Sequence, residues 1–191
     1  MLEIVTMATR GPDPLRELRR SRAALDSGNA RRALALLNQT LLCAGLDELT
    51  LVEKHTLRAL AYSQRGNSDA AELAVADAEK ALATAKPGTS RHVRARDGNS
   101  GRFPARPRPR WLLEAELHSV RSTIARQAMK AGLTADVKRQ TALEAAVAAM
   151  KILREHDLSR EPVDIRLACA LVLSRLSVAF ALSEGKDVAR T

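Results

Sequence analysis

Two segments of this chain align on a glycine, and this repeat constrains the fold more than any other feature. Residues 21–41 read SRAALDSGNARRALALLNQTL, and residues 58–82 read RALAYSQRGNSDAAELAVADAEKAL. In each, a Gly-Asn pair separates two runs with helical periodicity; Gly28 and Gly66 lie 38 residues apart. Glycine ends a helix well and asparagine begins one. A two-helix unit repeating at this spacing predicts helical hairpins stacked as a short solenoid.

Similar start and stop signals continue along the chain and predict an all-α fold of about seven helices. Asp13 and Pro14 begin the first helix, and Pro87 ends the fourth. No segment alternates with the period of two typical of a strand, so we expect no sheet. The expected helices cover about residues 14–27, 30–44, 50–65, 68–86, 110–131, 134–156 and 162–184.

The domain organisation that follows is a single helical domain interrupted by a basic loop. Residues 1–13 form an N-terminal tail, and 14–86 form two hairpins. Residues 87–110 form an arginine- and proline-rich arm, and 111–191 add three helices to the same domain. A chain of 191 residues is long enough to bury one substantial core.

The second repeat unit resembles the tetratricopeptide repeat family. The family pattern asks for small, bulky, glycine, alanine and small residues at set offsets, and the unit has Ala59, Tyr62, Gly66, Ala71 and Ala78 there. The first unit matches in part, through Ser21, Ala24, Gly28 and Ala33, with Thr40 at the last position. The resemblance covers residues 14–86.

This resemblance implies a concave groove that accepts a peptide or a partner helix, lined by the first helix of each hairpin. A fixed Lys/Asn/Arg set, with which some family members clamp a peptide carboxylate, is absent here. The leucines of the groove could equally belong to the core. In family register the groove residues are Leu15, Leu18, Arg22, Leu25, Asp26, Glu53, Thr56, Leu60, Ser63 and Gln64.

The segment 163–182 is apolar on nearly every face, unlike the polar outer face expected of a terminal helix in a stack. Two explanations remain open. Either this helix meets its own copy in a homodimer, with Leu173, Leu176 and Phe180 at the interface, or other helices of the chain surround it. Arg166 and Arg175 interrupt the segment, so we do not expect it to span a membrane.

The arm suggests a second function, binding of RNA or DNA. Eight cations and one aspartate give residues 86–110 a net charge of +7, out of +9 for the whole chain. Arginine suits phosphate contacts, and aromatic rings can stack on unpaired bases. A drifted, solvated insertion would look similar. The candidate polyanion-binding residues are Arg91, Arg94, Arg96, Arg102, Arg106, Arg108, Arg110, Phe103 and Trp111.

The residue types that carry catalysis are scattered. The four histidines have no partners at metal-ligand spacing, and phosphate loops and nucleophile motifs are absent. Glu114 and His118 share a helix face, which is far more often a solvated pair than a site. Cys43 and Cys169 lie in apolar runs and indicate buried thiols in a reducing, cytoplasmic setting. We therefore expect a binding protein with no catalytic residue, metal or cofactor and no signal peptide, engaging a protein or peptide through its groove.

Overall fold

The computed structural model describes residues 14–39, 46–86, 108–130 and 135–184, and within them the chain is all helical. Seven α-helices and one short 3-10 turn are present, and the described residues contain no strand, which confirms the all-α prediction. The elements are α1 (Pro14–Asp26), α2 (Ala30–Gln39), α3 (Glu48–Gln64), α4 (Ser68–Thr84), α5 (Arg110–Lys130), α6 (Ala135–Arg154), η2 (Leu158–Arg160) and α7 (Val163–Glu184). Asp13, Thr40, Cys43 and the tail 1–13 lie outside the described residues.

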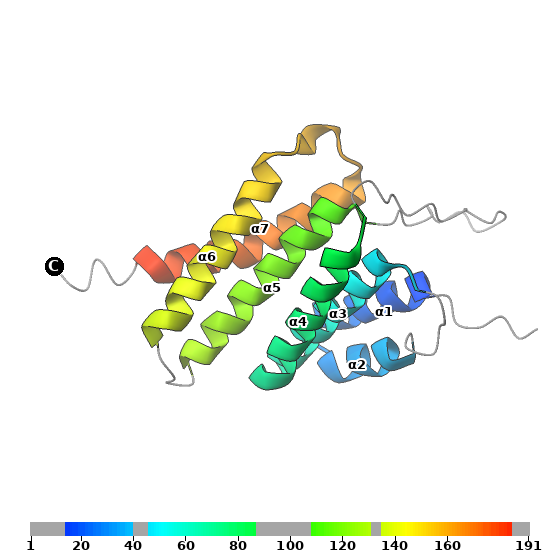
Figure 1. The fold of residues 1–191 in the computed structure, drawn as a ribbon, viewed down its shortest axis with the longest axis horizontal. Coiled ribbons are helices and arrows are strands. Elements are labelled where there is room, and N and C mark those ends of the chain that lie inside the picture. The colour runs from blue at the N-terminus through cyan, green and yellow to red at the C-terminus, as the bar shows by residue number, and fades with distance from the viewer. Residues whose placement is uncertain (1–13, 40–45, 87–107, 131–134, 185–191) are drawn as a thin grey trace, which may run out of the picture.

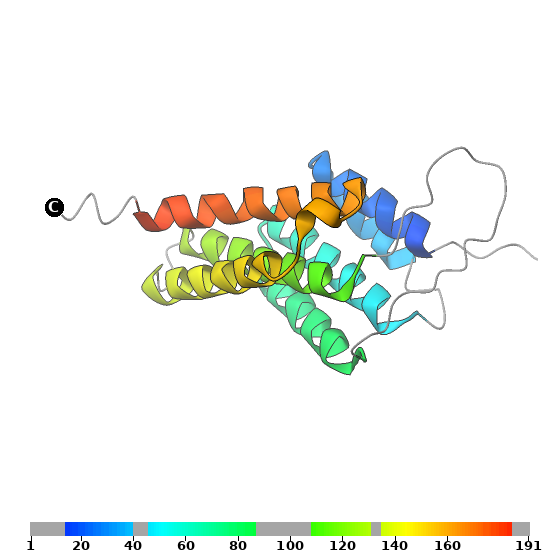
Figure 2. The same cartoon turned by 90° about the horizontal axis from the view of Figure 1, so that it is seen from above.

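In Figure 1, α6, α5 and α4 lie side by side, α7 runs behind α5 and α6, and α1, α2 and α3 lie on the other side of α4. Each helix packs against the one that follows it, and the odd-numbered helices α1, α3, α5 and α7 also pack successively against one another. Among the described residues, helices further apart in the sequence share no extensive contact. Seen from above, α7 lies along one side of the molecule and α4 along the opposite side (Figure 2). We call the side on which the odd-numbered helices converge the inner face.

The two turns that carry the sequence repeat have the same geometry. Gly28 and Gly66 adopt φ values of 76° and 73°, in the left-handed region that glycine enters without steric cost. The amide of Asn29 donates to Ala24 O at 2.7 Å, and the amide of Asn67 donates to Tyr62 O at 3.0 Å. This pattern satisfies the last carbonyls of one helix. Each asparagine side chain then accepts from the first turn of the next helix, at 3.0 and 3.1 Å.

The core is aliphatic and rich in alanine, which lets neighbouring helices approach closely. One cluster contains residues of the first five helices, α1 to α5. It includes Ala33, Ala59, Ala71 and Ala78, none of which is exposed. A second cluster joins α5, α6 and α7 around Cys169, whose free thiol is buried as expected. Four of the small residues that carry the family resemblance therefore lie at helix contacts.

α7 is buried on one side only. Leu176 is 1% exposed and packs in the core, so it is not placed to meet a second copy. Phe180 is half-buried against the same core and, with Val147 and Met150, lines a cleft of about 710 Å³ between α6 and α7. Leu173 is exposed. Leu176 is one of the three residues expected at a dimer interface, but the core of its own chain surrounds it.

No helix among the described residues combines the length and the apolar character that crossing a membrane requires.

Candidate partner-binding face

Four charged side chains from distant parts of the chain meet where α1, α3 and the start of α5 converge on the inner face. Arg22 Nη1 and Nη2 donate to Oε1 and Oε2 of Glu116 at 2.9 and 3.1 Å, and Nη2 also donates to Oε1 of Glu53 at 3.2 Å. Arg108, which precedes α5, donates to Glu116, and its Nε lies 3.9 Å from Glu53 Oε1. We call these four residues the polar cluster.

Helical spacing explains why these charges point inward. Arg22 lies four residues after Leu18 and three before Leu25, and both leucines are core residues. Residues three and four apart share a helix face. Glu116 is likewise spaced four residues from Leu112 and from Val120, which are fully buried. Each charged side chain therefore points into the interior because the residues on the same helix face pack in the core.

Burial makes these contacts strong and also costly. Glu53 and Glu116 are buried, and the two arginine side chains are only 15 and 16% exposed. Charges removed from water lose hydration that must be replaced by well-aligned partners. The two-pronged contact between Arg22 and Glu116 provides such alignment. Each carboxylate is shared by two guanidinium groups, so the cluster acts as one unit.

The electrostatic surroundings of the arginines reflect this crowding. Burial, followed by the charge of Arg22, lowers the pKa of Arg108 to about 9, so its guanidinium stays protonated at neutral pH. In α7, burial and then Arg22 lower the pKa of Arg175, while Asp26 raises it. Arg175 and Asp26 therefore belong to the same neighbourhood and extend the charged region to the end of α1 and the middle of α7.

The structure divides the expected groove residues into two groups. Leu18, Leu25 and Leu60 were expected to line the groove, but they are buried in the core, where a ligand cannot reach them. Two further groove residues, Thr56 and Ser63, are also buried, and their hydroxyls donate to Val52 O and to Gln127.

The remaining groove residues are accessible to different degrees. Leu15 is half-buried against the first core cluster, and Asp26 is exposed. Gln64 is also exposed, while its side-chain amide donates to Leu25 O at 3.3 Å. Arg22 and Glu53 belong to the polar cluster. The accessible part of the predicted groove is therefore a rim formed by Asp26 and Gln64 beside this cluster.

Three of the nine candidate polyanion-binding residues are described, and all three make contacts within the chain. Arg108 belongs to the polar cluster, and Arg110 donates to Ala85 O at the end of α4. Trp111 stacks on His156, with ring centroids 4.2 Å apart, and packs against the second core cluster. A polyanion would have to compete with these contacts, and polyanion binding by these three residues stays a prediction. Outside the described residues lie Arg91, Arg94, Arg96, Arg102, Phe103 and Arg106.

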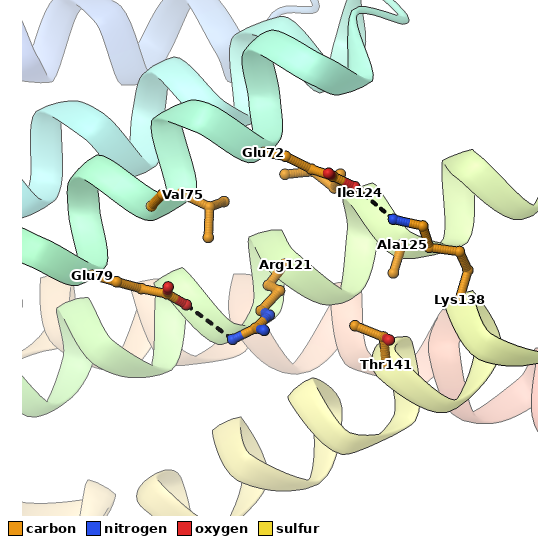
Figure 3. Close-up of a pocket in the computed structure, with 9 residues that line it drawn as sticks. Glu72, Val75, Glu79, Arg121, Ile124, Ala125, Lys138 and Thr141 are labelled. Atoms are coloured by element: carbon orange, nitrogen blue, oxygen red, sulfur yellow. Dashed lines mark hydrogen bonds and ion pairs between the residues drawn. The ribbon is translucent and has the colours of Figure 1, made fainter.

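A separate shallow cleft of about 250 Å³ lies between α4, α5 and α6 (Figure 3). Val75, Ile124 and Ala125 contribute its apolar surface. Two ion pairs flank it, Arg121–Glu79 at 2.9 Å and Lys138–Glu72 at 2.7 Å. Each cation beside the cleft is thus already paired with a carboxylate, so a charged ligand would have to displace an existing partner.

The three histidines among the described residues, His55, His118 and His156, do not gather into a site. Burial lowers the pKa of His118 despite Glu114 nearby, and burial likewise lowers that of His55, whose Nδ1 is 3.7 Å from Asp77. Both imidazoles are therefore neutral at pH 7. Within the described part of the chain, no group of three or more His, Cys, Asp or Glu side chains could hold a metal ion.

Sequence reasoning missed Glu116 and Arg175 as members of the charged region. A signal for Glu116 existed, because an acidic residue falls on the stripe that also contains Leu112 and Val120. An ionisable residue on an apolar helix stripe indicates a buried charge that needs a partner. For Arg175 the surrounding segment is apolar on all sides, so the pattern could not show the direction of the side chain.

No protein-family model matches the chain, and neither a curated protein nor a solved structure matches it.

Proposed function

We propose that this chain is a non-catalytic binding protein that holds a protein or peptide partner on the inner face of a short helical stack. The arrangement we propose is a solenoid of hairpins similar to tetratricopeptide repeats. Its support is that extensive packing occurs only between helices one or two places apart in the chain, and that one turn geometry recurs at Gly28 and Gly66. In such stacks the first helices of the hairpins, here α1, α3 and α5, present the binding surface.

The observation that carries this proposal is the polar cluster. Replacing a buried ion pair with apolar residues often leaves stability unchanged or raises it. Four charged side chains meet here, one each from α1, α3 and α5 and one from the residues before α5. Recognition of a partner therefore explains them better than stability of the fold does. The arginine side chains of the cluster keep 15 and 16% exposure, so a bound segment can reach their guanidinium groups, and Asp26 and Gln64 lie accessible beside them.

A displayed-peptide selection on the immobilised full chain tests this function. Peptides that bind are then measured by fluorescence anisotropy against Gln64→Lys on the inner rim and Glu144→Lys on the exposed face of α6. We expect Gln64→Lys to weaken binding by about tenfold, as for loss of one good interface contact, and Glu144→Lys to have no effect. Peptides that respond only to Glu144→Lys would place the binding surface elsewhere.

A nucleic-acid function remains the second proposal, supported by the net charge of +7 in residues 86–110. Because Arg108 and Arg110 are engaged within the fold, the test must use the arginines before them. Replacing Arg94, Arg96, Arg102 and Arg106 with serine should weaken binding to single-stranded RNA or DNA and flatten its salt dependence. Equal affinity of the variant and the natural chain would remove this proposal.

A further inference from the structure

The last helix, α7, has two apolar faces, and the structure covers only one of them. The buried face consists of Ile165, Ala168, Cys169, Val172, Leu176 and Ala179. Moving each of these positions forward by two residues gives the exposed set Leu167, Ala170, Leu171, Ser174, Val178 and Ala181. Two residues correspond to about 200° around a helix, which is its opposite side. We call the second set, together with Val163, the free face.

The exposure of the free face is substantial. Val163 is 70% exposed, Leu167 63%, Leu171 38% and Val178 48%. α1, α3 and α5 each have the next helix packed against them, whereas no described helix follows α7. The free face carries no charged residue at all. Its occupant should therefore be an apolar surface rather than a polyanion or an acidic peptide.

We propose that the occupant is α7 of a second copy, packed antiparallel about a two-fold axis. This arrangement makes the free face self-complementary. With the axis between residues 172 and 173, Leu171 of each copy lies opposite Ser174 of the other, and Leu167 lies opposite Val178. A large residue thus meets a small one at the centre, and the small Ala170 and Ser174 allow close approach of the two helices.

Charge also favours the antiparallel arrangement. Asp164 and Arg166 are exposed at the start of α7 and border the free face. A parallel pair would bring each of them close to its own copy, and like charges in contact are unfavourable. The antiparallel pair instead places them beside the uncharged residues 179–181 of the other copy. It also places the positive N-terminal end of each helix dipole beside the negative C-terminal end of the other.

The exposed area sets the expected strength. The large apolar side chains of the free face leave about 400 Å² exposed on each copy, within the range of the largest patch on a typical monomer. Two copies would cover about 800 Å² through these residues alone, below the roughly 1,200 Å² at which specific stable interfaces begin. The association we infer is therefore weak and concentration-dependent, with a dissociation constant on the order of micromolar.

Sedimentation equilibrium over a range of protein concentrations tests the proposal. We expect the mass to rise from 20.7 kDa toward twice that value as concentration increases. Leu171→Asp and Leu167→Asp should each weaken association by about tenfold or more, because a carboxylate would be buried without a partner. The matched control is Leu73→Asp, which alters a residue of α4 that is 67% exposed and should leave association unchanged.

These substitutions lie at exposed positions, so the helical circular dichroism spectrum should persist in all of them. A natural chain that stays at 20.7 kDa up to about a hundredfold above the expected micromolar constant would overturn the proposal. The proposal also fails if the two α7 variants associate as tightly as Leu73→Asp. A failure here leaves the inner-face function untouched, because that function uses α1, α3 and α5.

A cross-linking experiment tests the orientation, in a chain whose two natural cysteines are replaced by alanine. Ser174→Cys lies near the proposed axis and should cross-link to its copy through a short bis-maleimide. Val163→Cys should not, because in the antiparallel pair the two copies of residue 163 are about 28 Å apart along the helix axis. Cross-linking of both variants would show a parallel pair and contradict the geometry.

Discussion

Replacing Glu116 with glutamine should destabilise the fold strongly, because Glu116 is the acceptor that both arginines of the polar cluster share. Its two oxygens accept from Arg22 at 2.9 and 3.1 Å, and it accepts from Arg108 as well. Glutamine keeps the size of the side chain and removes the charge. Two guanidinium groups would then share the single carboxylate of Glu53.

The magnitude follows from the burial of the cluster. Removing one partner of a buried ion pair costs about 3–5 kcal/mol. Because the two arginine side chains retain 15–16% exposure, water offsets part of this loss, and we expect about 3 kcal/mol. For a domain of this size, that corresponds to a fall in Tm of about 6–12 °C.

Thermal and urea unfolding followed by fluorescence provide the assay, since Trp111 is the only tryptophan and packs against the second core cluster. The matched control is Glu79→Gln, which breaks the Arg121–Glu79 pair, whose side chains are each nearly half exposed. Exposed pairs contribute at most about 1 kcal/mol. If Glu116→Gln costs no more than Glu79→Gln, the cluster is not a buried, coupled unit and the reasoning is wrong.

A second comparison separates stability from recognition. The double substitution Arg22→Met, Glu116→Leu removes one charge of each sign and should be less destabilising than the sum of the two single changes. Additive losses would show that Arg22 and Glu116 act independently, contrary to their hydrogen bonds.

Three further outcomes are expected. Alanine at either turn glycine should cost about 1–2 kcal/mol in urea unfolding, because a side chain is strained at positive φ, and markedly unequal costs would contradict the equivalence of the two turns. Burial lowers the pKa of His55 and His118 below 6.5, so the unfolded chain binds more protons in mild acid; stability should be level above about pH 6.5 and fall below it, and a His55→Gln, His118→Gln variant that falls equally steeply would refute this cause. Replacing residues 89–106 with a short Gly/Ser linker should leave the Tm nearly unchanged, whereas replacing 89–109 should lower it because Arg108 is lost; equal Tm values would remove the structural role of Arg108.

The helices could be predicted because their ends depend on local chemistry. The Gly-Asn pairs at 28–29 and 66–67 stop one helix and begin the next within a few residues, and the structure contains the same hydrogen bonds at both. The polar cluster could not be predicted in this way. Arg22 and Glu116 are 94 residues apart in the sequence, and only the packing of α1, α3 and α5 brings them together.

α7 illustrates the other limit of sequence reasoning. Apolar residues occur around its whole circumference, so the pattern could not distinguish the side covered by α5 and α6 from the free side. Leu176, expected at an interface, is buried within the chain, whereas Leu171 and Val178 remain exposed. For the arm, the sequence left two alternatives open, a polyanion-binding segment or a solvated insertion, and neither indicated that Arg108 and Arg110 bond to groups in the folded body.

Photo-cross-linking in living cells tests the central claim, that the inner face binds a protein, most directly. A photoreactive amino acid would be placed in turn at Gln64 on the inner rim, at Phe103 in the arm and at Glu144 on α6, where both helical positions are exposed. The account predicts discrete protein adducts from Gln64 and none from Glu144. Nucleic-acid adducts from Phe103, with no protein adduct from Gln64, would contradict it.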